Sequence, residues 1–166
     1  NEERMNDRNI AIGNTYEVWR SGDVIPHMGK MVEEVENAEK VTFPKHCPAC
    51  GSELVKRGAT YYCENSARCP AQLKASIAYA VSRDVLNIDG LAEQTIELML
   101  KAGLIHRTAD LFKLHDAEIA SLEGYTEYSA NKLRRAILNS LHTTFDRFIM
   151  ALGIMDVGKS TARKLA

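Results

Sequence analysis

The sequence of 166 residues lacks the features of a membrane protein or a fibre. It has no run of about 18 consecutive apolar residues, which is the length that a helix needs to cross a bilayer. Its 10 glycines and 4 prolines are close to average usage, so the chain is neither collagen-like nor of low complexity. The start is polar and has no initiator Met and no apolar segment, so we expect no signal peptide. Because residues 161–166 end within a predicted helix, we expect a piece of a longer protein.

The sequence also has no large excess of positive or negative charge. The chain has 21 Lys and Arg against 22 Asp and Glu, and its net charge of −1 argues against a uniformly basic nucleic-acid binder. The charges are unevenly distributed, because residues 1–40 carry 5 basic and 9 acidic side chains while residues 41–166 carry 16 and 13. A weakly basic part joined to an acidic one is compatible with a local phosphate-binding face, so local motifs must decide.

What the sequence does have is four cysteines within 23 residues, in the pattern C-x2-C-x12-C-x5-C: Cys47, Cys50, Cys63 and Cys69. Two thiolates two residues apart bind one tetrahedral Zn²⁺ from a tight turn, and a second pair completes the shell. Residues 54–55 and 60–62 are predicted strands of a small ribbon between the pairs. We expect one structural Zn²⁺ per chain, because four protein ligands leave no open position for catalysis.

Two alternatives to this metal site remain open. The cysteines can form two disulfides, although nothing in the sequence indicates secretion and paired cysteines inside cells are more often metal ligands. His46 adjoins Cys47 and is a possible substitute ligand. We expect His46 to be a solvated or hydrogen-bonded neighbour, since four cysteines already complete the shell.

Downstream of Pro70 the apolar spacing becomes helical, first over residues 71–81. Three similar stretches follow, at residues 86–96, 122–130 and 154–162. Aligned on their central apolar residues Leu91, Tyr125 and Val157, they lie 34 and 32 residues apart. Repetition at such a period indicates one supersecondary unit used several times. Each stretch resembles the helix-hairpin-helix motif, although ordinary helical hairpins in an α-helical core are the alternative.

A Gly-hydrophobic-Gly hairpin followed by a helix is well suited to bind a phosphate group. Glycine permits backbone angles that point N–H groups outward, and the next helix adds its positive end. Such contacts carry no base information, so binding would be independent of sequence. In the first stretch Gly90 is present, and Ala92 stands at the second glycine position.

The other two stretches depart from the pattern in different ways. The second has Gly124 but Thr126 at the second position, and the third has Asp156 at the first position before Gly158 and Lys159. If the second position needs a positive φ, Ala costs on the order of 1 kcal/mol there and a β-branched Thr costs more. We therefore expect the first and third stretches to be the better phosphate sites and the second to be mainly scaffold.

A predicted helix at residues 129–141 carries three cations after the second hairpin: Lys132, Arg134 and Arg135. Such a cluster is usually a solvated helix face. Directly after a hairpin, the three side chains could also flank a track of phosphates. The sequence leaves both interpretations open.

The first 40 residues alternate as strands do. Strands are predicted at residues 16–20, 23–27 and 30–35, with a turn at residues 21–22. Two or three strands cannot bury a β domain alone, so we expect the last part of a barrel whose beginning is absent.

Taken together, these segments resemble NAD-dependent, bacterial-type DNA ligase over essentially the whole chain. The matching motifs occur in the order of that family, at residues 12–26, 43–51, 69–72, 109–112, 122–124, 129–130, 151–154 and 157–158. The resemblance implies an α+β protein with three parts. These are the C-terminal part of an OB-fold domain (1–40), a four-cysteine zinc finger (41–70) and a helix-hairpin-helix domain of three units, the third truncated (71–166).

The resemblance also implies a reaction in three steps. A lysine in an adenylation domain of the same full-length chain takes AMP from NAD, AMP passes to the 5′-phosphate of a nick, and the 3′-hydroxyl displaces it. These 166 residues contain no Lys-x-Asp-Gly motif, so we expect no catalytic or cofactor-binding residue here and an inactive fragment. NAD and Mg²⁺ would serve the full-length enzyme and not bind this fragment.

For this chain the resemblance implies binding to nicked double-stranded DNA, independent of sequence, in the cytoplasm and away from membranes. In the OB-like part, Arg20 is the best candidate for a phosphate contact, and Tyr16 and Trp19 are candidates for stacking on nucleotides. The hairpin candidates are Gly90, Ala92, Gly124, Thr126, Gly158 and Lys159. Two hypotheses compete with a ligase fragment: a non-enzymatic DNA-binding scaffold and a zinc-stabilised protein-interaction domain.

Overall fold

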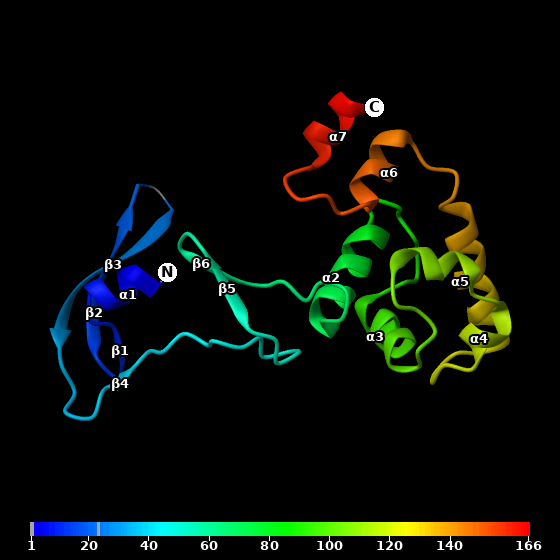
Figure 1. Cartoon of the computed structure of the whole chain (residues 1–166). Helices are drawn as coiled ribbons and strands as arrows, with labels where there is room; N and C mark the ends of the chain where they lie inside the picture. The colour runs from blue at the N-terminus through cyan, green and yellow to red at the C-terminus, as the bar shows by residue number, and fades with distance from the viewer. Residues whose placement is uncertain (1, 23) are drawn as a thin grey trace. The chain divides into compact units, whose positions relative to one another are not determined.

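The computed structural model describes residues 2–22 and 24–166 and confirms the predicted α+β class. The chain forms two compact units, Asn1–Asn65 and Ser66–Ala166. Short antiparallel strands dominate the first unit and helices form the second (Figure 1). None of the helices in the described part of the chain has the length and apolar character that crossing a bilayer requires.

The described residues of the first unit form one short helix and three two-stranded antiparallel sheets, in which β1 pairs with β4, β2 with β3 and β5 with β6. The elements are α1 (Glu2–Asp7), β1 (Ala11–Ile12), β2 (Thr15–Ser21), β3 (Ile25–Glu33), β4 (Glu39–Lys40), β5 (Leu54–Arg57) and β6 (Thr60–Cys63). The two strands predicted after Gly22 are thus one strand, β3. The start of that prediction, Asp23, lies outside the described residues.

This first unit has almost no apolar core. Among its residues whose burial is described, only Ala11 and Cys47 are buried. The helix α1, which the sequence did not predict, is held by polar contacts. The carboxylate of Glu2 accepts hydrogen bonds from Lys56 Nζ and Tyr61 OH, both at 2.6 Å. With so little apolar burial, this unit needs a further source of stability.

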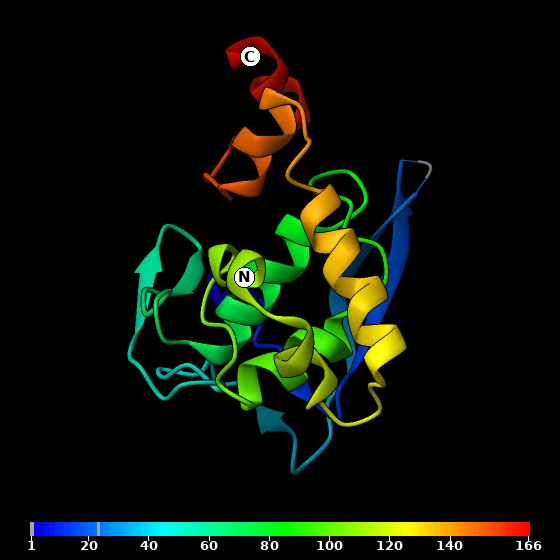
Figure 2. The same ribbon diagram turned by 90° about the vertical axis from the view of Figure 1, so that its right-hand side faces the viewer.

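The second unit is helical around one apolar core. Its elements are α2 (Pro70–Val81), α3 (Glu93–Lys101), the 3₁₀ helix η1 (Thr108–Lys113), α4 (Asp116–Ala120), α5 (Glu127–Asn139), α6 (Phe145–Ala151) and α7 (Lys159–Leu165). Fully buried aliphatic side chains from α2, α3, η1, α4 and α5 meet in this core, among them Ile77, Ile96 and Ile137. Figures 1 and 2 both show α6 and α7 at one end of the unit.

The three predicted repeats share one backbone conformation at their hairpins, residues 88–92, 122–126 and 154–158. The first hairpin position has a positive φ in every case: 80° at Gly90, 80° at Gly124 and 64° at Asp156. The next residue then donates its N–H to the carbonyl three residues earlier, as Tyr125 does to Leu122 at 3.1 Å. The three hairpins thus have the same backbone conformation, including the third, where Asp156 stands in place of glycine.

The second hairpin position corrects an expectation from the sequence. Ala92, Thr126 and Gly158 all have negative φ values, of −79°, −111° and −88°, and each is the N-cap of the following helix. Ala92 and Thr126 are therefore not strained, contrary to the expectation from the sequence, because this position is extended backbone that any residue adopts. Among the hairpin residues, Asp156 is the non-glycine residue with a positive φ. Asp adopts this left-handed conformation at less cost than most residues do.

The third repeat differs from the first two in burial. Two corresponding apolar positions are buried in the first two repeats and exposed in the third. The exposed fractions are 5% at Ile88, 6% at Leu122 and 51% at Ile154, and 0% at Met99, 3% at Leu133 and 59% at Leu165. The first two repeats share a core, and Thr95 Oγ1 in α3 lies 3.1 Å from Tyr125 OH in the second hairpin. The third repeat leaves these two positions open, although its Ala162, which aligns with Ile96 and Ala130, is buried in the same core.

The hairpin dihedrals predict different outcomes for two glycine substitutions. Gly124→Ala places a Cβ at φ 80° and should lower the free energy of unfolding by about 1 kcal/mol. Gly158→Ala has φ −88° and open space around the new Cβ, so it adds no backbone strain; the weaker N-cap preference of Ala offsets the entropy gain, and stability should change by less than about 0.5 kcal/mol. Urea unfolding followed by far-UV circular dichroism measures both. Equal losses for the two variants would contradict the positional difference.

Candidate metal centre and nucleic-acid interface

The four cysteines predicted as metal ligands come together. The Sγ atoms of Cys47, Cys50, Cys63 and Cys69 all lie within 4.8 Å of one another, and the pair Cys50–Cys63 is 3.6 Å apart. Four sulfurs placed 2.3 Å from a central Zn²⁺ in a tetrahedron are about 3.8 Å from each other. The thiols therefore fit a tetrahedral zinc ion without rearrangement of the backbone.

Local backbone geometry explains how the first pair of thiols converges. The N–H of Gly51 donates to the carbonyl of Cys47 at 2.8 Å, and the N–H of Cys47 donates to the carbonyl of Ser52 at 2.7 Å. Gly51 has a φ of 72°, which this tight turn requires and which glycine adopts without strain. The second pair comes from the end of β6, at Cys63, and from the N-cap of α2, at Cys69.

The thiols differ in acidity before a metal binds. The side-chain hydroxyl of Ser52 lies 3.4 Å from Cys50 Sγ and is the main cause that lowers the pKa of Cys50 to about 6. At Cys63 the backbone N–H of Asn65 lowers the pKa, but burial and the neighbouring Cys50 and Cys47 together raise it to about 11. Zinc binds thiolates, so binding at neutral pH should release the proton of Cys63, and affinity should increase with pH.

The structure bears on both alternatives to a four-cysteine site. None of these cysteines, all of them described residues, is in a disulfide bond. His46 forms an isolated β-bridge with Glu53, is exposed, and does not belong to the cluster of candidate ligands. Ser52 and Asn65 are the neighbours that sequence reasoning missed. Asn65 Nδ2 donates to Ser52 Oγ at 3.0 Å, and no spacing rule would have pointed to this pair.

The hairpin candidates for DNA binding are all exposed. They lie in three separate hairpins of the second unit, at Gly90 and Ala92, at Gly124 and Thr126, and at Gly158 and Lys159. No atom lies within 4 Å of a Cβ built on any of the three glycines. The Lys159 ammonium lies 3.6 Å from the Asp84 carboxylate, so its charge is partly compensated.

Capping distinguishes the second hairpin from the other two. Thr126 N–H donates to Ser129 Oγ at 2.8 Å, and Ser129 N–H donates to Thr126 Oγ1 at 3.2 Å. Ala92 and Gly158 cap their helices without a side-chain hydrogen bond. Two donors of the second hairpin, the N–H groups of Thr126 and Ser129, are therefore occupied internally. Ser129, three residues after Thr126, was the available signal, because such pairs form capping boxes.

In the first unit the structure separates the three candidates on β2. Arg20 is exposed opposite Pro26 on β3. Trp19 is 50% exposed, and its ring stacks on His27 at a centroid distance of 6.0 Å. Tyr16 is half-buried, and its hydroxyl accepts the N–H of Ala11 at 2.8 Å. Trp19, not Tyr16, is thus the aromatic side chain open to a nucleotide.

Removal of one thiol should abolish stable metal binding. Cys63→Ser should reduce bound zinc from one ion per chain to a small fraction, because an incomplete tetrahedral shell is much weaker. Metal analysis by mass spectrometry after dialysis against a mild chelator measures this loss. Ser52→Ala is the matched control, since it keeps all four thiols and should retain the zinc. Tight binding of one zinc ion by Cys63→Ser would show that Cys63 is not a ligand.

Comparison with known proteins agrees with this geometry. The family described as NAD-dependent DNA ligase C4 zinc finger domain matches residues 46–71. The DNA ligase of Pseudomonas savastanoi pv. phaseolicola is 44% identical over 173 residues, which cover 95% of this chain and 22% of that protein. The DNA ligase of Nitrosococcus oceani is 41% identical over 170 residues, which cover all of this chain and 25% of that protein. The chain thus spans about a quarter or less of the length of these curated relatives. The matches confirm the predicted resemblance to NAD-dependent DNA ligases, and this chain is similar to a part of those proteins.

Proposed function

We propose that this chain is a DNA-binding part of an NAD-dependent DNA ligase, which seals nicks in duplex DNA through ligase-AMP and DNA-AMP intermediates. The observation that carries the proposal is the hairpin conformation repeated three times in a segment 41–44% identical to DNA ligases. We assign residues 1–40 to the end of an OB-fold domain, residues 41–70 to a zinc finger and residues 71–166 to helix-hairpin-helix units.

The hairpins would bind the sugar–phosphate backbone through main-chain N–H groups. After the positive φ at the first position, the next residue packs inward, as Leu91 does, and the second-position residues Ala92, Thr126 and Gly158 lie exposed at the surface. Backbone donors of this kind bind phosphate oxygens whatever the base sequence. We expect the first and third hairpins to bind more strongly than the second, because the Thr126–Ser129 pair occupies donors that Ala92 and Gly158 leave without a side-chain partner.

The zinc ion would serve structure and not catalysis. When bound, it cross-links the four thiolates of Cys47, Cys50, Cys63 and Cys69 and keeps no open coordination position. Residues 41–69 bury only Cys47 and Cys69, so the segment has no apolar core that would replace the metal. We infer that DNA binding by this chain requires the zinc-loaded form.

We assign no chemical step to this chain. It contains no Lys-x-Asp-Gly motif, and adenylation with NAD and Mg²⁺ would take place in another domain of the full-length ligase. That enzyme would work on nicked DNA in the bacterial cytoplasm. The chain alone should therefore bind DNA without accepting AMP from NAD.

A titration of zinc-loaded chain against fluorescent nicked duplexes tests the proposal. Anisotropy should report binding that weakens as salt increases and is equal for duplexes of different sequence. Incubation with labelled NAD should leave the chain unlabelled. Absence of binding at low salt would overturn the proposal and favour a protein-interaction domain.

The capping difference predicts which hairpin variants lose affinity. Gly158→Val and Ala92→Val should each weaken binding to nicked DNA by about tenfold, because a branched side chain would screen N–H groups that donate to a charged phosphate. Thr126→Val is the matched control of similar volume and should change affinity less than twofold. Anisotropy measures the affinities, and circular dichroism checks that helix content is unchanged. If Gly158→Val and Ala92→Val bind like the unmodified chain, these hairpins serve only as scaffold.

A further inference from the structure

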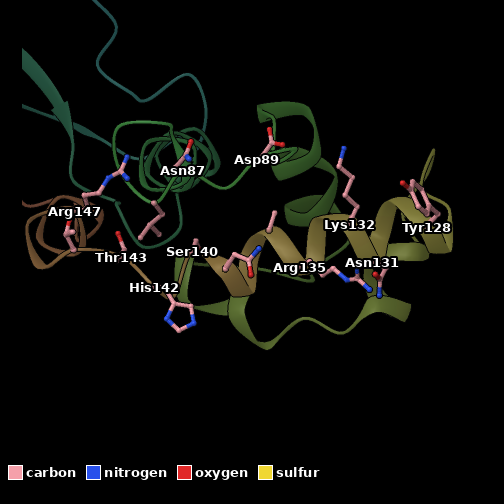
Figure 3. Close-up of a pocket in the computed structure, with 14 residues that line it drawn as sticks. Asn87, Asp89, Tyr128, Asn131, Lys132, Arg135, Ser140, His142, Thr143 and Arg147 are labelled. Carbon is pink, nitrogen blue, oxygen red and sulfur yellow. The ribbon is translucent and has the colours of Figure 1, made fainter.

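A cavity of about 590 Å³ lies in the second unit, apart from the hairpin donors discussed above. Its walls come from α5, from the start of the first hairpin and the residues before it (86–89), and from residues 142–147 (Figure 3). The lining is polar and cationic. It includes Lys132, Arg135, Arg147 and His142, with Asp89 as the single carboxylate among the lining residues.

We propose that this cavity binds phosphodiester groups of the DNA backbone, as a second contact surface that is separate from the hairpin N–H groups. The inference rests on the proposed function, because it takes DNA as the ligand of the chain. It adds contacts from side chains, most of which lie outside the three hairpins, to those proposed for the hairpin N–H groups. The lining includes three permanent cations, Lys132, Arg135 and Arg147, and one carboxylate, so its net charge is positive. The chain as a whole, in contrast, has a net charge of −1.

One face of α5 supplies the wall that carries most of the charge. Tyr128, Lys132 and Arg135 follow each other at intervals of four and three residues, so they lie on the same side of the helix. All three side chains are exposed, Tyr128 to 82%. Neither Lys132 nor Arg135 forms an ion pair with a residue in the described ranges 2–22 and 24–166. Their charges are therefore available to a ligand.

The structure also separates the three cations that the sequence grouped together. Arg134 does not line the cavity, and its Nη1 atom is buried without a hydrogen-bond partner among the described residues. Lys132 and Arg135 are exposed and line the cavity. The interpretation as a phosphate track thus applies to two of the three side chains.

The wall opposite α5 fixes a further cation. Arg147 Nη2 donates to the carbonyl of Arg83 at 2.5 Å, and its Nε faces the carbonyl of Asp84 at 3.4 Å. These contacts orient the guanidinium without neutralising it, because carbonyls carry no net charge. In Figure 3, Lys132 and Arg135 project from α5, while Asn87, Asp89 and Arg147 lie on the elements across the cavity.

The composition of the lining favours a backbone phosphate over an apolar ligand. Small-molecule pockets are mostly apolar with few polar groups. This cavity instead presents cations beside neutral hydrogen-bonding side chains such as Asn131 and Thr143, which bind phosphate oxygens in protein–DNA complexes. Asp89 opposes an anion near its own side of the cavity, so the phosphates would lie closer to α5. A free nucleotide carries the same phosphate chemistry and is the alternative source of such a ligand.

The test uses the whole zinc-loaded chain and a double variant, Lys132→Gln with Arg135→Gln. Loss of two phosphate contacts should reduce the slope of log affinity against log salt by about 1.8, since each neutralised phosphate contributes roughly 0.9. Affinity for nicked duplex at moderate salt should fall at least tenfold. The charge-retaining variant Lys132→Arg with Arg135→Lys should keep the original slope, which separates a charge effect from a packing effect.

Matched controls and competing ligands decide the outcome. Lys101→Gln with Lys113→Gln removes the same charge from side chains that are both 71% exposed and paired with Glu97 and Asp110, and its slope should stay within 0.5 of the original. An unchanged slope for the cavity variant, while the unmodified chain still binds DNA, overturns the inference and leaves the proposed function standing. Saturable AMP binding at Lys132 in NMR titrations, with DNA affinity unchanged by the cavity variant, assigns the site to a free nucleotide and also overturns it. Absence of DNA binding by the unmodified chain refutes the proposed function itself.

Discussion

The convergence of four thiols is the constraint on which the segment before the helices depends. Residues 41–69 bury only Cys47 and Cys69, and β5 and β6 form a two-stranded ribbon that would be marginally stable alone. A metal ion that joins four ligands provides the stability that such a short segment cannot obtain from apolar burial. The tight turn at Gly51 and the position of Cys69 at the start of α2 are the local geometry through which this constraint acts.

The helical unit solves a different problem, because it has a large apolar core and uses it to present hairpins. The three hairpins share a positive φ at the first position and an extended backbone at the second. Their surroundings differ. The second is closed by the Thr126–Ser129 capping pair, and the third leaves Ile154 and Leu165 exposed where the first two repeats bury the equivalent residues. The three hairpins thus share one backbone conformation but differ in the groups that they expose to solvent.

Much of this organisation could be predicted from the sequence, and the errors have identifiable causes. Cysteine spacing predicted the cluster because thiolate ligands are few and their geometry is narrow. The spacing of Leu91, Tyr125 and Val157 predicted the repeats because each unit needs an apolar residue at the same point of its hairpin. Ala92 and Thr126 are not strained as expected, because residue type does not reveal which of the two hairpin positions has the positive φ.

The sequence by itself determined which groups are available: four thiols within 23 residues, a repeated hairpin pattern, and a cluster of cations after the second hairpin. Only the tertiary structure decided how they are used. It placed Lys132 and Arg135 at the wall of a cavity, together with Arg147. It buried part of Arg134, although Arg134 lies between Lys132 and Arg135 in the chain. The physical reason is that helical periodicity sends adjacent side chains to different faces, and packing by distant segments determines which face meets solvent.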